Sequence, residues 1–319
     1  MSGITCTHQN QARSSDVGEM HQALFYGDAE EYLDGVLHFI APALAAGEPV
    51  AIAVPGAKAE LLRERLGDLA DEIEILDMVE LGRNPARIIP AVEMMLAKHD
   101  GQLLHYVGEP IWPGRSEEEV REATKHEALI NLAWPGARIR VLCPYDTTAL
   151  DQRVLADAER THPELIRGGE HRRSAAYAGP TVPVACEQPL SASPPDAVAL
   201  AFGIEELANV RALVSEQAIA AGMEREGVMD LVLAVNELAT NAVRHGDGGG
   251  TLHVWRRPTR VVCQIDDRGQ ITDPLAGRRT PAPDAAGGVG LWTVNQLCDL
   301  VEVRSSDAGT TVRVHISLN

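Results

Sequence analysis

The chain has 319 residues and a formal net charge of −18 at pH 7, with 45% hydrophobic and 23% charged residues. This length favours two domains, and the composition is that of a folded protein rather than a disordered one. The acidic charge argues against a broad basic surface, so we expect no direct nucleic-acid partner and no anionic membrane partner.

The N-terminal segment and the cysteines indicate in which cellular compartment the protein is expected. Residues 1–20 are polar and lack an apolar h-region, so we expect a disordered lead-in rather than a signal peptide. No run approaches the ~20 apolar residues that span a bilayer. The five cysteines are scattered and contain no C-x-x-C pair, which favours reduced thiols. We therefore expect a soluble, cytoplasmic protein.

Residues 21–167 alternate helical stretches with short apolar runs. A helical stretch begins near Lys58, and further helical segments separate the apolar runs. The pattern predicts an α/β domain with a parallel sheet. The expected strands are 49–54, 73–77, 102–107 and 139–145.

Residues 168–197 have a different texture. Gly168-Gly169 is followed by five prolines that interrupt any periodicity, which predicts a semi-rigid linker.

Residues 198–319 form a second pattern, which predicts an α+β sandwich with a mixed sheet on one side and helices on the other. The expected helices are 207–221, 228–243 and 291–299, and the expected strands are 251–255, 261–266, 300–304 and 310–318.

The helix predicted at 228–243 carries a core stripe and, beside it, two polar residues. Glu237 and Asn241 are four residues apart, so they lie one turn apart on the same side of the helix. The carboxylate could accept a proton, and the amide could offer an oxygen to Mg²⁺. The core stripe comprises Leu231, Ala234, Val235, Leu238 and Ala242.

Two later segments belong to the same chemistry. Asp267-Arg268-Gly269 places a carboxylate at a strand end, where it could accept a hydrogen bond from the exocyclic amine of adenine. The run Gly287–Trp292 is glycine-rich and opens a helix, so its N–H groups could approach phosphates. Taken in this order, the three segments predict a nucleotide site.

With these motifs, residues 198–319 resemble the GHKL ATPase superfamily, and most closely its anti-sigma serine kinases. The resemblance implies a Bergerat-type sandwich that binds ATP and Mg²⁺, with Glu237 as general base and Asn241 as the Mg²⁺ ligand. Asp267 matches the adenine-binding carboxylate. A second glycine of that motif is replaced here by Gln270-Ile271, which makes adenine binding a safer expectation than efficient turnover. The nucleotide-binding residues so implied are Asn241, His245, Asp267, Gly269, Gly288, Gly290, Leu291, Thr310 and Thr311.

The N-terminal domain carries motifs of its own at 21–26, 108–112 and 143–146. With these it resembles the MEDS sensory domain, a RecA/KaiC-like α/β sheet, over about residues 21–163. The resemblance implies a small-molecule ligand. A G-x-x-x-x-G-K-[ST] loop is absent after the early strand, so ATP hydrolysis is not expected in this half. The candidate ligand-sensing residues, expected at the carboxyl ends of the strands, are His21, Tyr26, Glu109, Trp112 and Tyr145.

The leading hypothesis is a ligand-responsive anti-sigma factor that phosphorylates Ser or Thr of an anti-anti-sigma (STAS-type) partner, with a sigma factor as a further partner. Kinases of this kind commonly dimerise through the ATP domain, which leaves a homodimer open. Two alternatives remain. One is a sensor histidine kinase, which needs an exposed phosphoacceptor histidine such as an H box around His126. The other is a non-catalytic, ATP-dependent partner switch.

Overall fold

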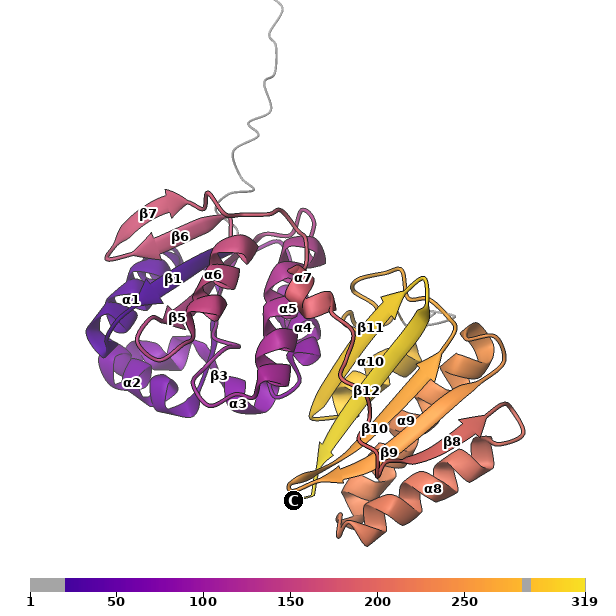
Figure 1. The fold of residues 1–319 in the computed structure, drawn as a ribbon. Helices are drawn as coiled ribbons and strands as arrows, with labels where there is room; N and C mark the ends of the chain where they lie inside the picture. The colour runs from indigo at the N-terminus through magenta and orange to yellow at the C-terminus, as the bar shows by residue number, and fades with distance from the viewer. Residues whose placement is uncertain (1–20, 283–287, 319) are drawn as a thin grey trace, which may run out of the picture.

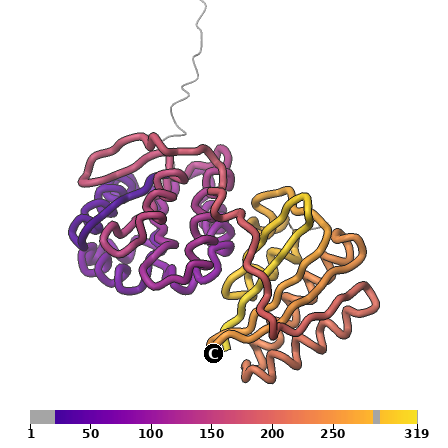
Figure 2. Tube along the Cα trace, viewed as in Figure 1, coloured from indigo at the N-terminus to yellow at the C-terminus, as the bar shows by residue number. Residues whose placement is uncertain are grey.

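The computed structural model describes residues 21–282 and 288–318, which form two domains joined by an extended linker (Figures 1 and 2). The predicted lead-in, residues 1–20, lies outside the described residues. Within them, no helix has the length and apolar character needed to cross a membrane.

The N-terminal domain is built on one sheet with the strand order β3-β2-β4-β5-β1-β6-β7. All four predicted strands are present, and neighbouring strands run parallel except at one edge, where β7 is antiparallel to β6. The strands are β1 (His21–Tyr26), β2 (Val50–Val54), β3 (Glu74–Asp77), β4 (Leu104–Gly108), β5 (Ile139–Asp146), β6 (Glu164–Arg167) and β7 (Glu170–Arg173).

The prediction of a wholly parallel sheet is therefore wrong, because this sheet is mixed. The reason lies in Gly168 and Gly169, which both adopt positive φ angles of 56° and 78°. Two left-handed residues in succession fold the chain back on itself as a tight hairpin. The hairpin adds β7, from within the range predicted as linker, to the edge of the sheet.

Helices cover both faces of this sheet. One core joins α1 (Ala29–Ala46) and α2 (Gly56–Leu66) to one face, and a second core joins α4 (Ile88–Lys98), α5 (Glu117–Ala133) and α6 (Gln152–Thr161) to the other. The result is a three-layer α/β/α domain (Figure 1). The short helices are η1 (Gly67–Glu72), α3 (Met78–Leu81) and η2 (Pro85–Arg87).

Local sequence sets the helix ends. Asp28 caps α1 by accepting a hydrogen bond from the N–H of Glu31, and Gly47 ends the helix in the left-handed conformation. At the start of α5, Ser116 and Glu119 form a reciprocal capping box, in which each side chain accepts a hydrogen bond from the other residue's N–H. The capping box fixes where α5 begins, and therefore which residues of α5 face the second domain.

The C-terminal domain has a five-stranded sheet with the order β11-β12-β10-β9-β8. Every neighbouring pair is antiparallel, so the predicted mixed sheet is wrong. The pairs β9–β10 and β11–β12 are hairpins, and the helices between β8 and β9 return the chain in the opposite direction. Strands β10 and β11 run in the same direction, and β12 lies between them. The five strands are β8 (Val198–Phe202), β9 (Gly250–Arg257), β10 (Arg260–Asp267), β11 (Leu300–Ser306) and β12 (Gly309–Ser317).

One face of this sheet packs on α8 (Leu207–Ala220), α9 (Arg225–His245) and α10 (Val289–Leu297), which confirms the predicted sandwich of one sheet and one helical layer. Alternation along the strands places polar side chains on the opposite face. That face includes Gln264, Glu302, Arg304 and Arg313, all of which are nevertheless buried.

The linker and the first domain bury this polar face. The linker, which contains α7 (Val184–Glu187), runs along β12 (Figure 1) and its Ser191 carbonyl accepts a hydrogen bond from Arg313. From the first domain, α5 presents Glu118, which pairs with Arg257 at 2.7 Å, and Lys125, which bonds the carbonyl of Val303 at 3.3 Å. The two domains thus share a polar interface built on α5.

Glu122 is the buried centre of that interface. Its Oε1 lies 2.8 Å from a guanidinium nitrogen of Arg304, and its Oε2 lies 3.0 Å from one of Arg278. The carboxylate is fully buried, and both guanidinium groups are only 6% exposed. Since each charge depends on the others for compensation in a dry environment, the three form one unit that joins the domains.

We predict that Glu122→Ala lowers the free energy of unfolding by about 3–5 kcal/mol, because it leaves two buried guanidinium groups without their carboxylate. The measurement is urea unfolding followed by circular dichroism. Glu60→Ala is the matched control, since it removes an exposed partner of Arg63 and should change stability by less than about 1 kcal/mol. An equally small effect for both variants would contradict the assignment of Glu122 as the interdomain link.

Candidate functional site

The long helix α9 carries the first part of the site. The predicted core stripe of this helix is buried, including Leu231, Ala234 and Leu238. Glu237 and Asn241 are half-buried beside that stripe, one turn apart, at the level where α10 begins. The pattern that places apolar residues in the core therefore also directs this carboxylate and amide toward the start of α10.

Gly290, in the first turn of α10, lies directly against this pair. A Cβ atom at this position would come within 3.0 Å of Glu237 Oε2 and 3.1 Å of Asn241 Nδ2. Any larger residue at this position would require the ends of these two side chains to move by a few tenths of an ångström. Gly288, the N-cap, adopts the left-handed conformation with a φ of 86°. Gly287, the first residue of the predicted glycine-rich run, lies outside the described residues, as do residues 283–286.

Asp267 ends β10 on the other side of the site. Its Oδ1 accepts a 2.6 Å hydrogen bond from the N–H of Gly269. Burial raises the pKa of this carboxyl above its ordinary value, the Gly269 N–H lowers it, and the neighbouring Asp266 raises it. The C-terminus of α9 packs closely here, because a Cβ at Gly246 would lie 2.7 Å from Asp267 Oδ1. The Oδ1 bond fixes the orientation of the carboxylate and leaves Oδ2 for a further donor.

The turn before β12 closes the site, and the two threonines after it face opposite ways. Thr310 Oγ1 donates to the carbonyl of Gly269 at 2.8 Å. Thr311 Oγ1 instead donates to Asp266 at 2.6 Å, on the opposite face of the sheet. The turn itself needs Gly309, because a Cβ there would meet the carbonyl oxygen of Asp267 at 2.2 Å.

These parts surround one cavity. Its wall includes seven of the predicted nucleotide-binding residues besides Asn241, and two predicted residues are placed differently. Glu237 is not part of the wall but lies against Gly290, which is. Thr311 faces away from the cavity. Leu238, Ile265 and Val312 form an apolar floor that the motifs did not indicate. The predicted residues that line it are Asn241, His245, Asp267, Gly269, Gly288, Gly290, Leu291 and Thr310.

The segment between β10 and α10 forms the remaining wall, and the first domain holds it in place. Ile271 and Ala276 line the cavity, whereas Leu275, one residue away, is buried in the core of the N-terminal domain. Arg278 pairs with Glu122, and the N–H of Thr280 bonds Glu93 at 2.9 Å. We name residues 271–280 the docked segment.

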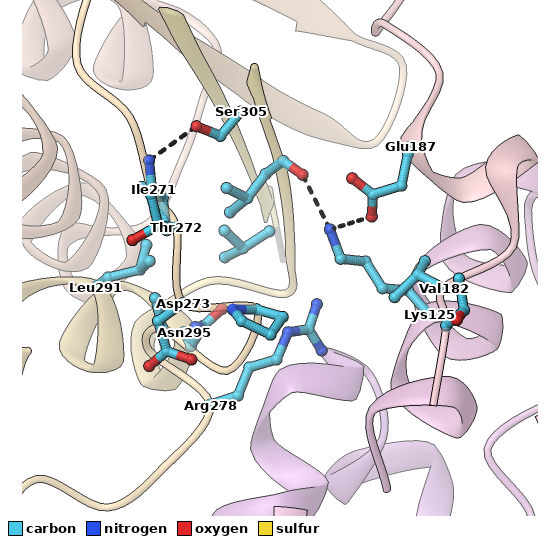
Figure 3. A pocket seen from close by; sticks show the side chains of 15 residues that line it. Lys125, Val182, Glu187, Ile271, Thr272, Asp273, Arg278, Leu291, Asn295 and Ser305 are labelled. Carbon is cyan, nitrogen blue, oxygen red and sulfur yellow. Dashed lines mark hydrogen bonds and ion pairs between the residues drawn. The ribbon is translucent and has the colours of Figure 1, made fainter. Parts of the chain in front are cut away.

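A second cavity lies between the domains (Figure 3). Lys125, Val182 and Glu187 line one side, and Lys125 Nζ pairs with Glu187 at 2.9 Å. The other side comes from the docked segment, α10 and β11. Three residues, Ile271, Ala276 and Leu291, line both this cavity and the first one. The two cavities therefore have a common wall.

The candidate ligand-sensing residues of the first domain lie in its interior. Tyr26 and Glu109 come together at the carboxyl ends of β1 and β4, where Lys58 bonds both of them. Burial raises the pKa of Glu109 to about 7, although Lys58 lowers it. Trp112 is partly buried and lies under the guanidinium of Arg115 at 4.3 Å.

His21 and Tyr145 are also buried, but in a separate cluster with His162, whose ring centroid lies 3.9 Å from that of His21. Sequence reasoning did not single out Lys58 or His162. For Lys58 a signal exists, since the residue lies at the start of α2, four residues after the end of β2, and Tyr26 and Glu109 lie at the ends of their own strands.

Comparison with known proteins agrees with this geometry. The MEDS family, described as the methanogen/methylotroph, DcmR sensory domain, matches residues 20–163, and the histidine kinase-like ATPase domain matches residues 201–316. The chain joins a MEDS domain to a histidine kinase-like ATPase domain. The second family implies nucleotide binding, and the cavity between α9, α10 and β10 is where its motifs meet.

Solved structures with similarity include the RsbU and RsbW domains of Rv1364c from Mycobacterium tuberculosis. The identity is 22%, with 40% of this chain and 33% of that chain covered and a TM-score of 0.31. The Acinetobacter baumannii histidine kinase AdeS is 14% identical, with 38% and 68% covered and a TM-score of 0.24. The chain thus spans about a third of the first of these structures. No curated protein matches the chain.

We predict that Gly290→Ala weakens MgATP binding about tenfold, or ~1.4 kcal/mol, because the methyl group must displace Glu237 or Asn241. Isothermal titration calorimetry measures the effect. Gly56→Ala is the control, since its added Cβ would meet nothing closer than 3.9 Å. Unchanged affinity in Gly290→Ala would show that this contact does not belong to the nucleotide site.

Proposed function

We propose that this protein is a ligand-responsive, ATP-binding regulator whose ATPase domain phosphorylates a serine or threonine of an anti-anti-sigma (STAS-type) partner. The single observation that carries the proposal is the packing of Gly290 against both Glu237 and Asn241. This contact brings a carboxylate, an amide and the N-terminus of a helix to one point, and phosphoryl transfer from ATP uses all three.

The residues fit Mg²⁺ and the phosphates of ATP. The carbonyl oxygen of Asn241 is a hard ligand suited to Mg²⁺, and the N–H groups at the start of α10 suit the phosphates. Mg²⁺, when bound, would neutralise the charge of the transferring phosphoryl group. Asp267 would receive the adenine amine through Oδ2, since its Oδ1 already accepts the N–H of Gly269.

Glu237 would act as general base. The oxygen of the partner's hydroxyl forms a bond to the γ-phosphorus as the bond to the ADP oxygen breaks, and the hydroxyl proton passes to the Glu237 carboxylate. Most of the catalysis would come from positioning, and here Gly290 and the core packing of α9 hold Glu237 in place.

The remaining parts of the proposal concern partners and place of action. By sequestering a sigma factor, the ATPase domain would act as an anti-sigma factor in the cytoplasm, where transcription takes place. The MEDS domain, a RecA/KaiC-like sheet in this proposal, would bind a small molecule through residues such as Tyr26 and Glu109. The homodimer stays a prediction.

Two sets of contacts support control of the ATPase domain by the MEDS domain. Arg87 donates to the carbonyls of Asn295, Gln296 and Cys298, so the first domain caps the C-terminus of α10, whose N-terminus lies at the nucleotide cavity. In addition, the docked segment forms the wall shared by the two cavities. A shift of α5 or η2 on ligand binding would therefore move residues of the nucleotide site.

The histidine kinase alternative requires an exposed phosphoacceptor. His126, the one candidate on α5, is 1% exposed and packs inside the MEDS domain. No second long helix beside α5 forms a dimerisation hairpin among the described residues. Phosphorylation of His126 would require the domain to open, so a serine or threonine on a separate partner fits the structure better.

We predict that Glu237→Gln binds MgATP with parental affinity and transfers phosphate to a STAS-type partner at least about a hundredfold more slowly, the low end of a general base's contribution. Transfer of labelled γ-phosphate and calorimetry measure the two properties. Glu226→Gln, in the first turn of the same helix, is the matched control. Transfer by Glu237→Gln at the parental rate would rule out the proposed role of this residue.

The same experiment separates the kinase from a non-catalytic switch. Tight MgATP binding by the wild type, with neither ADP production nor a labelled partner, would replace the kinase by an ATP-dependent clamp. Failure of the wild type to bind MgATP at millimolar concentration would overturn both readings.

A further inference from the structure

Four side chains with metal-binding atoms meet in the interior of the MEDS domain, away from the nucleotide site. They are His21 on β1, Glu127 on α5, Cys143 on β5, and His162 directly after α6. One potential ligand atom from each lies within 4.8 Å of all the others. All four residues are at most 1% exposed. We name this set the buried cluster.

Three of the distances between ligand atoms of the buried cluster are close to those of a tetrahedral metal site. Glu127 Oε2 lies 3.1 Å from His21 Nε2 and 3.3 Å from His162 Nε2, and Cys143 Sγ lies 3.5 Å from His21 Nε2. Bonds from Zn²⁺ of about 2.0–2.3 Å to nitrogen, oxygen and sulfur place neighbouring ligand atoms about 3.3–3.8 Å apart in a tetrahedron. The side chains therefore need only small movements to coordinate one ion.

Neighbouring groups orient both imidazole rings. His162 Nδ1 lies 2.9 Å from the carbonyl of Ala158, which only accepts hydrogen bonds, so this nitrogen carries the proton. The unprotonated Nε2 then presents its lone pair to the buried cluster. A backbone carbonyl on the far nitrogen is the usual outer-shell partner of a metal-binding histidine.

His21 is oriented by Asn131 in the same way. The Asn131 amide nitrogen donates to the carbonyls of Glu127, Ala128 and Thr161, which leaves its Oδ1 facing His21 Nδ1 at 3.2 Å. His21 Nδ1 must then be the donor, and its Nε2 also presents a lone pair to the buried cluster.

The buried cluster is consequently rich in electron pairs and poor in protons. Two imidazole lone pairs face one carboxylate oxygen, and Glu127 Oε1 has no hydrogen-bond partner within residues 21–282 and 288–318. One proton, from the thiol or from a ring nitrogen, can form a hydrogen bond at only one of these contacts. If both rings were protonated, the two positive charges would repel each other, because the ring centroids are 3.9 Å apart. A single dication at the centre would satisfy all four ligand atoms at once.

We propose that His21, Glu127, Cys143 and His162 bind one late first-row transition-metal ion, with Zn²⁺ as the favoured occupant. The mixture of thiolate, imidazole and carboxylate suits Zn²⁺ rather than Mg²⁺ or Ca²⁺. Binding converts the Cys143 thiol to a thiolate, and its proton passes to solvent. Four protein ligands make this a closed, structural type of site, and the ion would fix α5, the helix that also carries Glu122.

The test is metal analysis of the full-length protein by plasma mass spectrometry, after incubation with Zn²⁺ and removal of free metal. We expect about one Zn²⁺ per chain in the wild type, and at least a tenfold weaker affinity in Cys143→Ser and His162→Ala, as loss of a ligand requires. Cys186→Ser is the matched control, because Cys186 is also buried but lies outside the buried cluster; it should retain the metal.

Co²⁺ binding to the wild type provides a readout that does not depend on whether the ligand variants Cys143→Ser and His162→Ala fold. In the wild type we expect a thiolate-to-cobalt charge-transfer band and strong visible absorption typical of tetrahedral coordination, with the charge-transfer band also present in Cys186→Ser. No stoichiometric Zn²⁺ or Co²⁺ in the wild type would overturn the proposal. So would binding without a thiolate band, or binding unchanged in both Cys143→Ser and His162→Ala.

Discussion

The buried ion pairs of Glu122 with Arg278 and Arg304 are the constraint on which the rest of the structure depends. One carboxylate on a helix of the MEDS domain compensates two guanidinium groups of the ATPase domain, one on the docked segment and one on β11. Sliding one domain against the other while the interface stays dry would leave these charges without their partners, which is strongly unfavourable. Electrostatic interactions therefore fix the position of one domain against the other, and the first domain buries the polar face of the second sheet.

This constraint reaches the nucleotide site by two routes. The docked segment has Arg278 and Leu275 fixed on the MEDS domain, while Ile271 and Ala276 of the same segment line the nucleotide cavity. Helix α10 is capped at one end by Arg87 and carries Gly290, which lines the proposed nucleotide cavity, at the other. A packed interior changes between discrete arrangements and does not deform gradually. A rigid helix and a short anchored segment can therefore carry a small displacement from the first domain to the cavity in the second.

The sequence predicted the local parts of this picture better than the long-range ones. Periodicity found four strands of the first sheet and the helix that carries Glu237 and Asn241, because strand and helix patterns depend only on residues within about four positions of one another. It could not show that Gly168 and Gly169 turn β7 back onto the sheet, nor that the second sheet is wholly antiparallel. Sequence reasoning did not single out Glu122, because its partners are 156 and 182 residues away. His162 and Cys143 likewise share no motif spacing, and only the fold brings them to His21.

The account rests centrally on the claim that the MEDS domain holds the wall of the nucleotide site, and MgATP calorimetry on Arg278→Ala tests this claim most directly. Arg278 is outside the set of residues proposed to touch ATP, and Glu122 keeps Arg304 when it is lost. We expect MgATP to bind at least about fivefold more weakly, the lower end of typical coupling between sites, with faster amide exchange in residues 271–280. Arg63→Ala, an exposed change outside the interface, should leave both unchanged. Parental affinity and parental exchange in Arg278→Ala would contradict control of the nucleotide site through the docked segment.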